Sequence, residues 1–258
     1  MDLTGRTAVV TGASRGIGAG IAEELHARGL NLAVCARSPA ALPAADRVLV
    51  ECLDVTDAEA VSRFTGLAEA RFGTIDLWIN NAGVLEPIAP LRDVSVEDFR
   101  HHVDVNLTGV FLGAQAFVHH VRGREGEGVL VNVSSGAAQH AYPGWSAYCA
   151  AKAAVDRLTE CIALEEADAD LRAYAVAPGV VDTHMQDLIR ASTAADFPRV
   201  EQFKEMKRLG HFNTAAFVAR ELLALAFDPA RRDDGVLVRL PNEWEQKDRR
   251  LRDSVSRS

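Results

Sequence analysis

A tyrosine and a lysine stand four residues apart in SAYCAAKAA (146–154), a stretch made otherwise of small side chains. If the stretch is helical, Tyr148 and Lys152 lie one turn apart on the same face. A nearby ammonium group favours the phenolate and lowers a tyrosine pKa that is otherwise near ~10, so the phenol can exchange a proton with a carbonyl or hydroxyl oxygen. The same spacing also fits a core tyrosine beside a lysine stem.

Two further polar positions favour the chemical interpretation. Two serines end the apolar run 128–135, and ligands of open α/β sheets bind at the carboxyl ends of strands. Ser135 can therefore hydrogen-bond a substrate oxygen and hold it against Tyr148. Asn106 lies in an apolar helical stretch, where its amide needs a partner: either a water linked to Lys152 or backbone that it pins.

A glycine-rich turn, TGASRGIG (11–18), follows the first apolar run and opens a helical pattern. Gly12 can turn the chain tightly, Gly16 lets a pyrophosphate approach, and Gly18 lets the helix pack on the sheet. The first N–H groups of the helix then face the phosphates. The spacing departs from the commonest dinucleotide fingerprint, but the strand–turn–helix context favours cofactor binding over a purely structural turn.

The end of the second apolar run bears on the choice of cofactor. Enzymes that use NAD usually carry an acid about 20 residues after the glycines, where it binds the ribose hydroxyl. Here VCARSPAAL (34–42) contains Arg37, and no acid occurs before Asp46. Arg15 is a second cation, inside the glycine turn. Two guanidinium groups suit a 2′-phosphate, although both also fit ordinary surface arginines, and we predict NADP(H).

The elements that must position these residues follow from the hydrophobic pattern. Seven short, β-branched, almost continuously apolar runs alternate with helical patterns, which is typical of parallel strands covered on both faces. We predict a single-domain α/β fold, a doubly wound parallel sheet (Rossmann-like) with about seven strands and helices on both faces. The expected strands are 7–12, 31–36, 47–55, 75–83, 128–135, 171–179 and 235–240, and the expected helices are 16–28, 57–72, 96–122, 146–167 and 214–227.

We expect one domain over residues 1–242. Segment 184–212 lacks a strand and is long for a connection, so it is a candidate lid over the substrate. The polar and charged tail 243–258 is expected to be frayed or disordered.

Composition excludes several other classes of function. The chain has 258 residues and a net charge of −8, so no broad basic surface for nucleic acid or anionic membrane is expected. No apolar run approaches the ~18 residues that span a bilayer, and the N-terminus has no signal-peptide pattern. The four cysteines form no CxxC pair, which favours free thiols and a cytoplasmic location. The histidine pairs 101–102 and 119–120 are adjacent on predicted helices and face different directions, so we predict no metal.

These motifs together resemble the short-chain dehydrogenase/reductase family over residues 4–240: TGASRGIG, NNAG (80–83), Asn106, Ser135, YCAAK (148–152) and PGVVDT (178–183). The resemblance implies a catalytic tetrad of Asn106, Ser135, Tyr148 and Lys152. It also implies a homodimer or homotetramer packed through 96–122 and 146–167. The resemblance places Asp54 and Val55 near adenine and Thr183 near the carboxamide. Together with the glycine turn and the two arginines, the predicted cofactor-binding residues are Gly12, Ser14, Arg15, Gly16, Ile17, Gly18, Arg37, Asp54, Val55, Asn81, Ala82, Gly83, Tyr148, Lys152, Pro178, Gly179, Val181 and Thr183.

The stretch 146–212 resembles the sepiapterin reductases and the bacterial benzil reductases, a branch that implies NADPH-dependent reduction of a carbonyl beside a second carbonyl. Sepiapterin reductases carry an acid near the C-terminus that anchors the pterin, and Arg239 stands there instead. This favours an aromatic 1,2-dicarbonyl over a pterin. The candidate substrate residues are Tyr142, Trp145, Met185 and Arg239, of which the first three also fit plain packing.

Two alternatives stay open. The first is the same fold acting on another substrate: a pterin, or another ketone or alcohol such as a sugar, a steroid or an acyl-carrier ketone. The second is a non-catalytic module that senses NADP. Such modules usually lose the tyrosine or the lysine, and both are present here.

Overall fold

A seven-stranded parallel sheet forms the centre of the computed structural model, which describes residues 3–40, 42–232 and 235–246. The strands lie in the order β3-β2-β1-β4-β5-β6-β7, as the predicted doubly wound fold requires. The order reverses between β1 and β4, which is where ligands bind in such sheets. The bounds are β1 Thr7–Thr11, β2 Asn31–Ala36, β3 Val48–Cys52, β4 Leu77–Asn80, β5 Gly128–Val133, β6 Leu171–Ala177 and β7 Leu237–Arg239.

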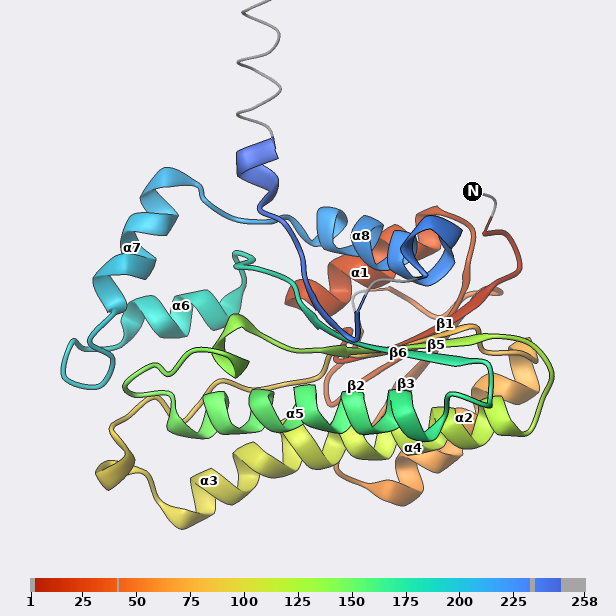
Figure 1. Cartoon of the computed structure of the whole chain (residues 1–258), viewed down its shortest axis with the longest axis horizontal. Helices are drawn as coiled ribbons and strands as arrows, with labels where there is room; N and C mark the ends of the chain where they lie inside the picture. Colours follow the sequence, from red (N-terminus) through yellow and green to blue (C-terminus); the bar gives the residue numbers. More distant parts are fainter. Residues whose placement is uncertain (1–2, 41, 233–234, 247–258) are drawn as a thin grey trace, which may run out of the picture.

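Helices cover both faces of the sheet, which explains why its strands are apolar almost throughout. On one face lie α1 (Gly16–Ala27) and α8 (Ala215–Phe227). On the other face lie α2 (Ala58–Phe72), α4 (Gly109–Arg122) and α5 (Ser146–Glu165) (Figure 1). The carboxyl ends of the strands and the start of α5 point toward α6 (His184–Ala191) and α7 (Val200–Leu209), so the candidate site lies at that end.

The helix expected over 96–122 is interrupted. It begins as α3 (Val96–Val103), passes through a π-helical segment (Asp104–Thr108) and continues as α4. Asn106 lies within the π-helical segment, and its side-chain amide donates to the carbonyl of His102, 3.1 Å away, which belongs to the preceding turn. A π segment inserts an extra residue into the turn, and such segments occur frequently at functional sites.

Segment 184–212, the candidate lid, contains α6 and α7 and no strand. The residues that flank the segment lie side by side, because Val181 and Asn213 form an isolated parallel bridge. Asp182 accepts hydrogen bonds from Arg190 of α6, at 3.0 Å, and from Lys207 of α7. One carboxylate at the base of the segment therefore holds both of its helices.

The start of the predicted C-terminal tail is ordered. Residues 243–246 are helical, and Glu243 is buried. The Glu243 carboxylate accepts from the backbone N–H and the hydroxyl of Thr214, each at 2.8 Å, and so fixes the entry to α8. The prediction of a frayed tail from residue 243 was wrong for 243–246, and 247–258 lie outside the described residues.

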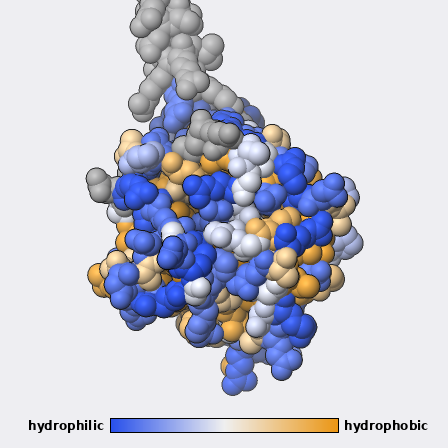
Figure 2. All heavy atoms as spheres, turned by 90° about the vertical axis from the view of Figure 1, so that its right-hand side faces the viewer, coloured by the Kyte–Doolittle hydropathy of each residue, from blue (hydrophilic) through white to orange (hydrophobic). Residues whose placement is uncertain are grey.

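The surface at the end opposite α6 and α7 is mostly hydrophilic, with apolar side chains scattered between the polar ones (Figure 2). Among the helices of the described ranges, none is long and apolar enough to cross a bilayer.

Candidate active site

The glycine turn between β1 and α1 has a conformation that requires glycine. Gly12 and Gly16 have φ of +71° and +62°, in the left-handed region. A Cβ on Gly12 would lie 2.7 Å from the Cα of Ala82, and one on Gly18 would lie 2.4 Å from the carbonyl oxygen of Gly12. Backbone is thus packed against backbone here, in the compact turn that a dinucleotide phosphate needs.

The N-terminus of α1 is free to receive a phosphate. Arg15 occupies the N-cap position without a side-chain capping hydrogen bond, so the first backbone N–H groups of the helix are not satisfied by the cap. Ser14 and Ile17, also predicted to bind cofactor, are half-buried in the same turn. Thr183 lies above this turn, since a Cβ on Gly16 would come within 3.4 Å of its methyl group. These features fit a nicotinamide dinucleotide.

Asn81 has a structural role that the sequence did not predict. Its side-chain amide donates to the carbonyls of Thr11 and Gly12, at 3.0 and 3.2 Å. The Thr11 hydroxyl in return accepts from the backbone N–H groups of Asn81 and Ala82, at 3.0 and 3.1 Å. These bonds tie the NNAG segment to the glycine turn. A threonine at the end of an otherwise apolar strand was the signal that could have identified this partner.

At the predicted adenosine end, Asp54 and Arg37 lie close enough to interact. Burial alone would raise the pKa of Asp54, but hydrogen bonds from Thr56 and the positive charge of Arg37 bring it below its usual value. Val55 is buried against α4, where a Cβ on Gly109 would come within 2.7 Å of it. Within the described ranges neither Arg15 nor Arg37 has a side-chain hydrogen bond or ion pair, and both are exposed.

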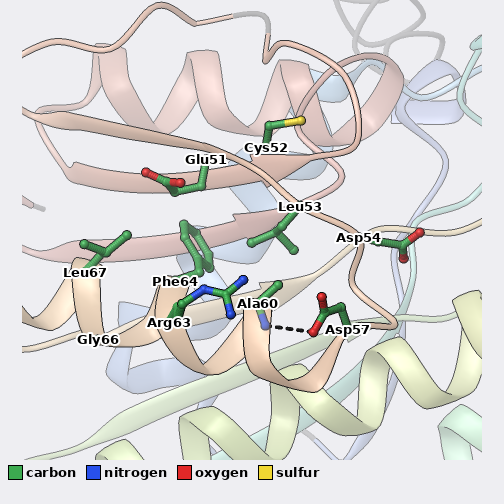
Figure 3. A pocket seen from close by; sticks show the side chains of 10 residues that line it. All are labelled: Glu51, Cys52, Leu53, Asp54, Asp57, Ala60, Arg63, Phe64, Gly66 and Leu67. Atoms are coloured by element: carbon green, nitrogen blue, oxygen red, sulfur yellow. Dashed lines mark hydrogen bonds between the residues drawn. The ribbon is translucent and has the colours of Figure 1, made fainter.

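A separate cavity of about 460 Å³ lies between β3 and α2 (Figure 3). Asp57 caps α2 at its edge by accepting from the N–H of Ala60 at 3.0 Å. In Figure 3 the Asp54 side chain points away from Arg63 and Phe64, which line the cavity's middle. No residue of the predicted tetrad or glycine turn lines it, so we do not assign substrate binding to it.

Tyr148 and Lys152 share one face of α5, as their spacing predicts. Both are buried, and the Lys152 ammonium lies 5.8 Å from the centre of the Tyr148 ring. Lys152 donates to the carbonyl of Val133 at 2.7 Å, which holds it against the end of β5. Burial lowers the pKa of Lys152 from 10.5 to about 8, although the charge of Asp156 opposes this.

The tyrosine pKa moves in the direction opposite to the one expected from the sequence. Burial raises the pKa of Tyr148, and the nearby hydroxyl of Ser135 only partly offsets this. The phenol therefore holds its proton at neutral pH, as a proton donor must. Ser135 follows β5, and its oxygen also accepts from the N–H of Ala137 at 3.2 Å.

Asn106 is fully buried and pins backbone directly. Its amide oxygen accepts from the N–H of Val84 at 3.2 Å, and its amide nitrogen donates to the Val84 carbonyl at 2.9 Å. Gly83 lies between Asn106 and Lys152: a Cβ there would be 2.8 Å from the Asn106 oxygen and 3.9 Å from the Lys152 nitrogen. The sequence left two roles open for Asn106, a link through water to Lys152 and the pinning of backbone. The direct hydrogen bonds to Val84 support the second role.

Two residues near the tetrad were missed. Asp156, one turn after Lys152, accepts from the Ser134 hydroxyl, and burial raises its pKa. His102 is fully buried, with its ring edge-on to Tyr148 at 6.0 Å, and burial lowers its pKa. Its neighbour His101 is exposed, as expected for adjacent residues on a helix. In the described part of the chain no group of three or more potential ligands could hold a metal ion.

Three of the four candidate substrate residues belong to one apolar cluster with Tyr148. Tyr142, Trp145 and Met185 pack there together with side chains from 184–212. The Trp145 ring stacks on Phe197 at 4.5 Å and meets the Tyr148 ring edge-on at 5.7 Å. We call this group, Tyr142, Trp145, Tyr148, Met185, Ile189, Phe197 and Phe203, the aromatic cluster.

Arg239, the fourth candidate, stands apart on β7. It is exposed and pairs in register with Ala177 of β6, and no hydrogen bond or ion pair within the described residues joins it to the aromatic cluster. The loop that follows β6, in contrast, reaches the glycine turn through Thr183, whose methyl group lies near Gly16. Its Pro178 carbonyl accepts from Asn213 at 2.8 Å, and Gly179 has a φ of +76°. Val181, two residues further on, forms the bridge with Asn213 that flanks the segment containing α6 and α7.

Comparison with known proteins gives consistent matches. The short chain dehydrogenase family profile matches residues 6–194. A benzil reductase of Bacillus subtilis that forms (S)-benzoin is 33% identical over 224 residues, 84% of this chain and 91% of that protein. A 3beta-hydroxysteroid dehydrogenase of Eggerthella lenta is 35% identical, covering 89% of each chain. The crystal structure of the KRED1-Pglu enzyme superposes with a TM-score of 0.81 at 31% identity, covering 90% of this chain and 99% of that one.

Proposed function

Because this chain belongs to the short-chain dehydrogenase/reductase family of oxidoreductases, which use nicotinamide cofactors, we propose that it is an NADPH-dependent carbonyl reductase. Its substrate in this proposal is an aromatic 1,2-dicarbonyl, of which one carbonyl becomes a hydroxyl group and the product is a chiral hydroxyketone. The observation that carries the proposal is the packing of Tyr148, the proton donor, into a cluster of aromatic side chains.

Each member of the tetrad has a role that its surroundings support. NADPH, when bound, supplies the hydride to the carbonyl carbon. Tyr148 donates its proton to the carbonyl oxygen, and Ser135 hydrogen-bonds the same oxygen. Lys152, fixed by the Val133 carbonyl, carries the positive charge that stabilises the phenolate left behind. Asn106 holds Val84 in place and so fixes the chain next to Gly83, which lies beside Lys152.

The cofactor choice rests on Arg15 and Arg37. Both guanidinium groups are exposed at the predicted ribose end, and neither has a side-chain hydrogen bond or ion pair within the described residues. A 2′-phosphate would supply the anionic partner that each can bind through two hydrogen bonds. The phosphates between the two nucleosides would lie at the N-terminus of α1.

The aromatic cluster favours this substrate class over the alternatives. A polar sugar finds few hydrogen-bond partners among Trp145, Phe197 and Phe203, whereas aromatic rings stack on them. The relatives reported above act on benzil and on a steroid, so similarity alone does not choose between these substrates. The presence of both Tyr148 and Lys152 favours catalysis over a module that only senses NADP.

Segment 184–212 acts in this proposal as a lid whose side chains close over the substrate and exclude water. We also propose a cytoplasmic location, and a homodimer or homotetramer formed through α4 and α5. Exposed apolar side chains on both helices, Phe111 and Leu164, support such an interface.

The test is a comparison of kcat/KM for benzil and for sepiapterin, each with NADPH, on the wild type and on Arg239→Asp. We expect the wild type to prefer benzil, and the variant to shift the ratio toward sepiapterin because it introduces an anchoring acid. A wild type that prefers sepiapterin, or that does not reduce benzil, contradicts the substrate assignment.

A further inference from the structure

The indole N–H of Trp145 is buried and has no hydrogen-bond partner within the described residues. Trp78, also buried, differs: its indole N–H donates to the side-chain oxygen of Asn80 at 2.8 Å. Buried tryptophan N–H groups usually find a partner, because an unmade hydrogen bond is unfavourable. A ligand that brings an acceptor to Trp145 would remove this penalty.

The position of Trp145 is fixed relative to the proposed proton donor. It directly precedes α5, and its carbonyl accepts from the N–H of Cys149 at 2.8 Å, so its backbone is part of the first helical turn. The indole meets the Tyr148 ring edge-on, with ring centres 5.7 Å apart. The unpartnered donor therefore belongs to the same rigid turn as the phenol that delivers the proton.

The groups that cover the indole come from the candidate lid. Phe197 stacks on it at 4.5 Å and Phe203 packs against it at 5.6 Å, and both lie in 184–212. A substrate that enters between this segment and α5 consequently meets Trp145 and Tyr148 together.

We propose that the indole N–H of Trp145 donates a hydrogen bond to the second carbonyl oxygen of the 1,2-dicarbonyl, the one that is not reduced. This inference rests on the proposed function. Tyr148 and Ser135 bind the oxygen of the carbonyl that accepts the hydride. The neighbouring carbonyl carbon is directly bonded to the first, so its oxygen lies within reach of a donor beside Tyr148. Trp145 is in this role a specificity-determining residue, which favours dicarbonyls over simple ketones.

Trp145→Phe tests this role, because it keeps an aromatic ring and removes the N–H. The matched substrates are benzil and deoxybenzoin, which have the same two phenyl rings but differ in the second carbonyl. We expect Trp145→Phe to lower kcat/KM for benzil about five- to tenfold, the range of one hydrogen bond, and to change that for deoxybenzoin less than about twofold. Phe203→Leu is the control: it disturbs the same cluster without removing a donor and should lower both values in proportion.

A second measurement needs no variant of the site. The chain has three tryptophans, so ¹⁵N-indole labelling yields three N–H signals. In the presence of NADP⁺, which does not support reduction, benzil should move the Trp145 signal downfield, and deoxybenzoin should not. Equal losses for both ketones in Trp145→Phe, or a Trp145 signal that does not distinguish them, overturns the inference. If the wild type reduces benzil, either result leaves the proposed function intact, whereas a wild type that does not reduce benzil overturns both.

Discussion

At the scale of single residues, the Lys152 side chain is buried, although the proposed mechanism needs its ammonium group to be charged. Its side chain is 5% exposed, and its ammonium has the Val133 carbonyl as a hydrogen-bond partner. Burial lowers its pKa to about 8, which means that the folded protein binds this proton less tightly than the unfolded chain does. Keeping an ammonium in this position therefore reduces the stability of the fold.

This effect predicts a specific pH dependence of stability. The penalty is fully present well below pH 8, where Lys152 is charged in both states, and it is lost as pH rises from 8 toward the unfolded value of 10.5. Between pH 7.5 and 9.5 the wild type should gain about 2 kcal/mol of unfolding free energy relative to Lys152→Met. Urea unfolding of both proteins at the two pH values measures this. A difference between them that does not change with pH would show that Lys152 is not held with a lowered pKa.

Arg37 is the second residue with a direct test. Its guanidinium is exposed and has no ion pair in the described part of the chain, so its removal disturbs little of the fold. Arg37→Ala should weaken NADPH binding roughly tenfold or more, the range of a charge-assisted hydrogen bond, and should leave NADH binding almost unchanged. Titration calorimetry with both cofactors measures this, with Arg63→Ala as a control from the neighbouring α2. Equal weakening of both cofactors would show that Arg37 does not contact the 2′-phosphate.

At the scale of elements, ion pairs to one carboxylate attach both α6 and α7 of the candidate lid. Asp182, at the base of the segment, bonds Arg190 of α6 and Lys207 of α7. Asp187 also bonds Arg190, at 2.6 Å, but it belongs to α6 itself and connects nothing across the segment. Asp182 and Asp187 thus both bind Arg190, but only Asp182 also binds α7.

Asp182→Asn should loosen both helices, since it removes the charge that holds them to the loop after β6. We expect faster amide hydrogen exchange in 184–209 and a two- to fivefold higher KM for the carbonyl substrate, the effect of weakened pairs at a partly exposed site. Asp187→Asn is the matched control and should affect α6 alone. If amide hydrogen exchange in α7 is equally fast in the two variants, Asp182 does not hold both α6 and α7.

The elements also indicate what the sequence could and could not predict. The periodicity of hydrophobic residues and the local composition correctly predicted all seven strands and five helical regions. This was possible because strands buried on both faces and helices packed on a sheet each leave a local hydrophobic pattern in the sequence. The π segment was not predicted, and the Asn106 side chain within it bonds Val84, which is 22 residues away in the chain and cannot be found from local periodicity. The ordered start of the tail likewise depends on Thr214 and Glu243 meeting across 29 residues. Tyr148 and Lys152, four residues apart on one helix, needed no such contact.

At the scale of the whole molecule, the outer faces of α4 and α5 carry apolar side chains that the fold leaves exposed. Leu164 is 81% exposed and Phe111 is 43% exposed. Large apolar and aromatic side chains at a surface are candidates for contacts between subunits, so these two positions are the ones to test for the proposed interface.

If the proposed oligomer forms through α4 and α5, Phe111→Glu combined with Leu164→Glu should shift it toward the monomer, because charge is unfavourable at the centre of an interface. Light scattering coupled to size-exclusion chromatography measures the mass. Leu209→Glu, at a side chain of α7 that is 46% exposed, is the control and should leave the mass unchanged. An unaltered mass in the double variant would place the interface elsewhere.

In the reaction that we propose, Tyr148 delivers a proton to one carbonyl of an aromatic dicarbonyl during NADPH-dependent reduction. The most direct measurement is the turnover of benzil with NADPH by the wild type and by Tyr148→Phe, with chiral chromatography of the product. We expect one enantiomer of benzoin from the wild type. We also expect a loss in kcat of at least ~10²-fold in the variant, with NADPH binding retained, so that the proton transfer by Tyr148 is tested apart from cofactor binding. Turnover by Tyr148→Phe close to that of the wild type would contradict it.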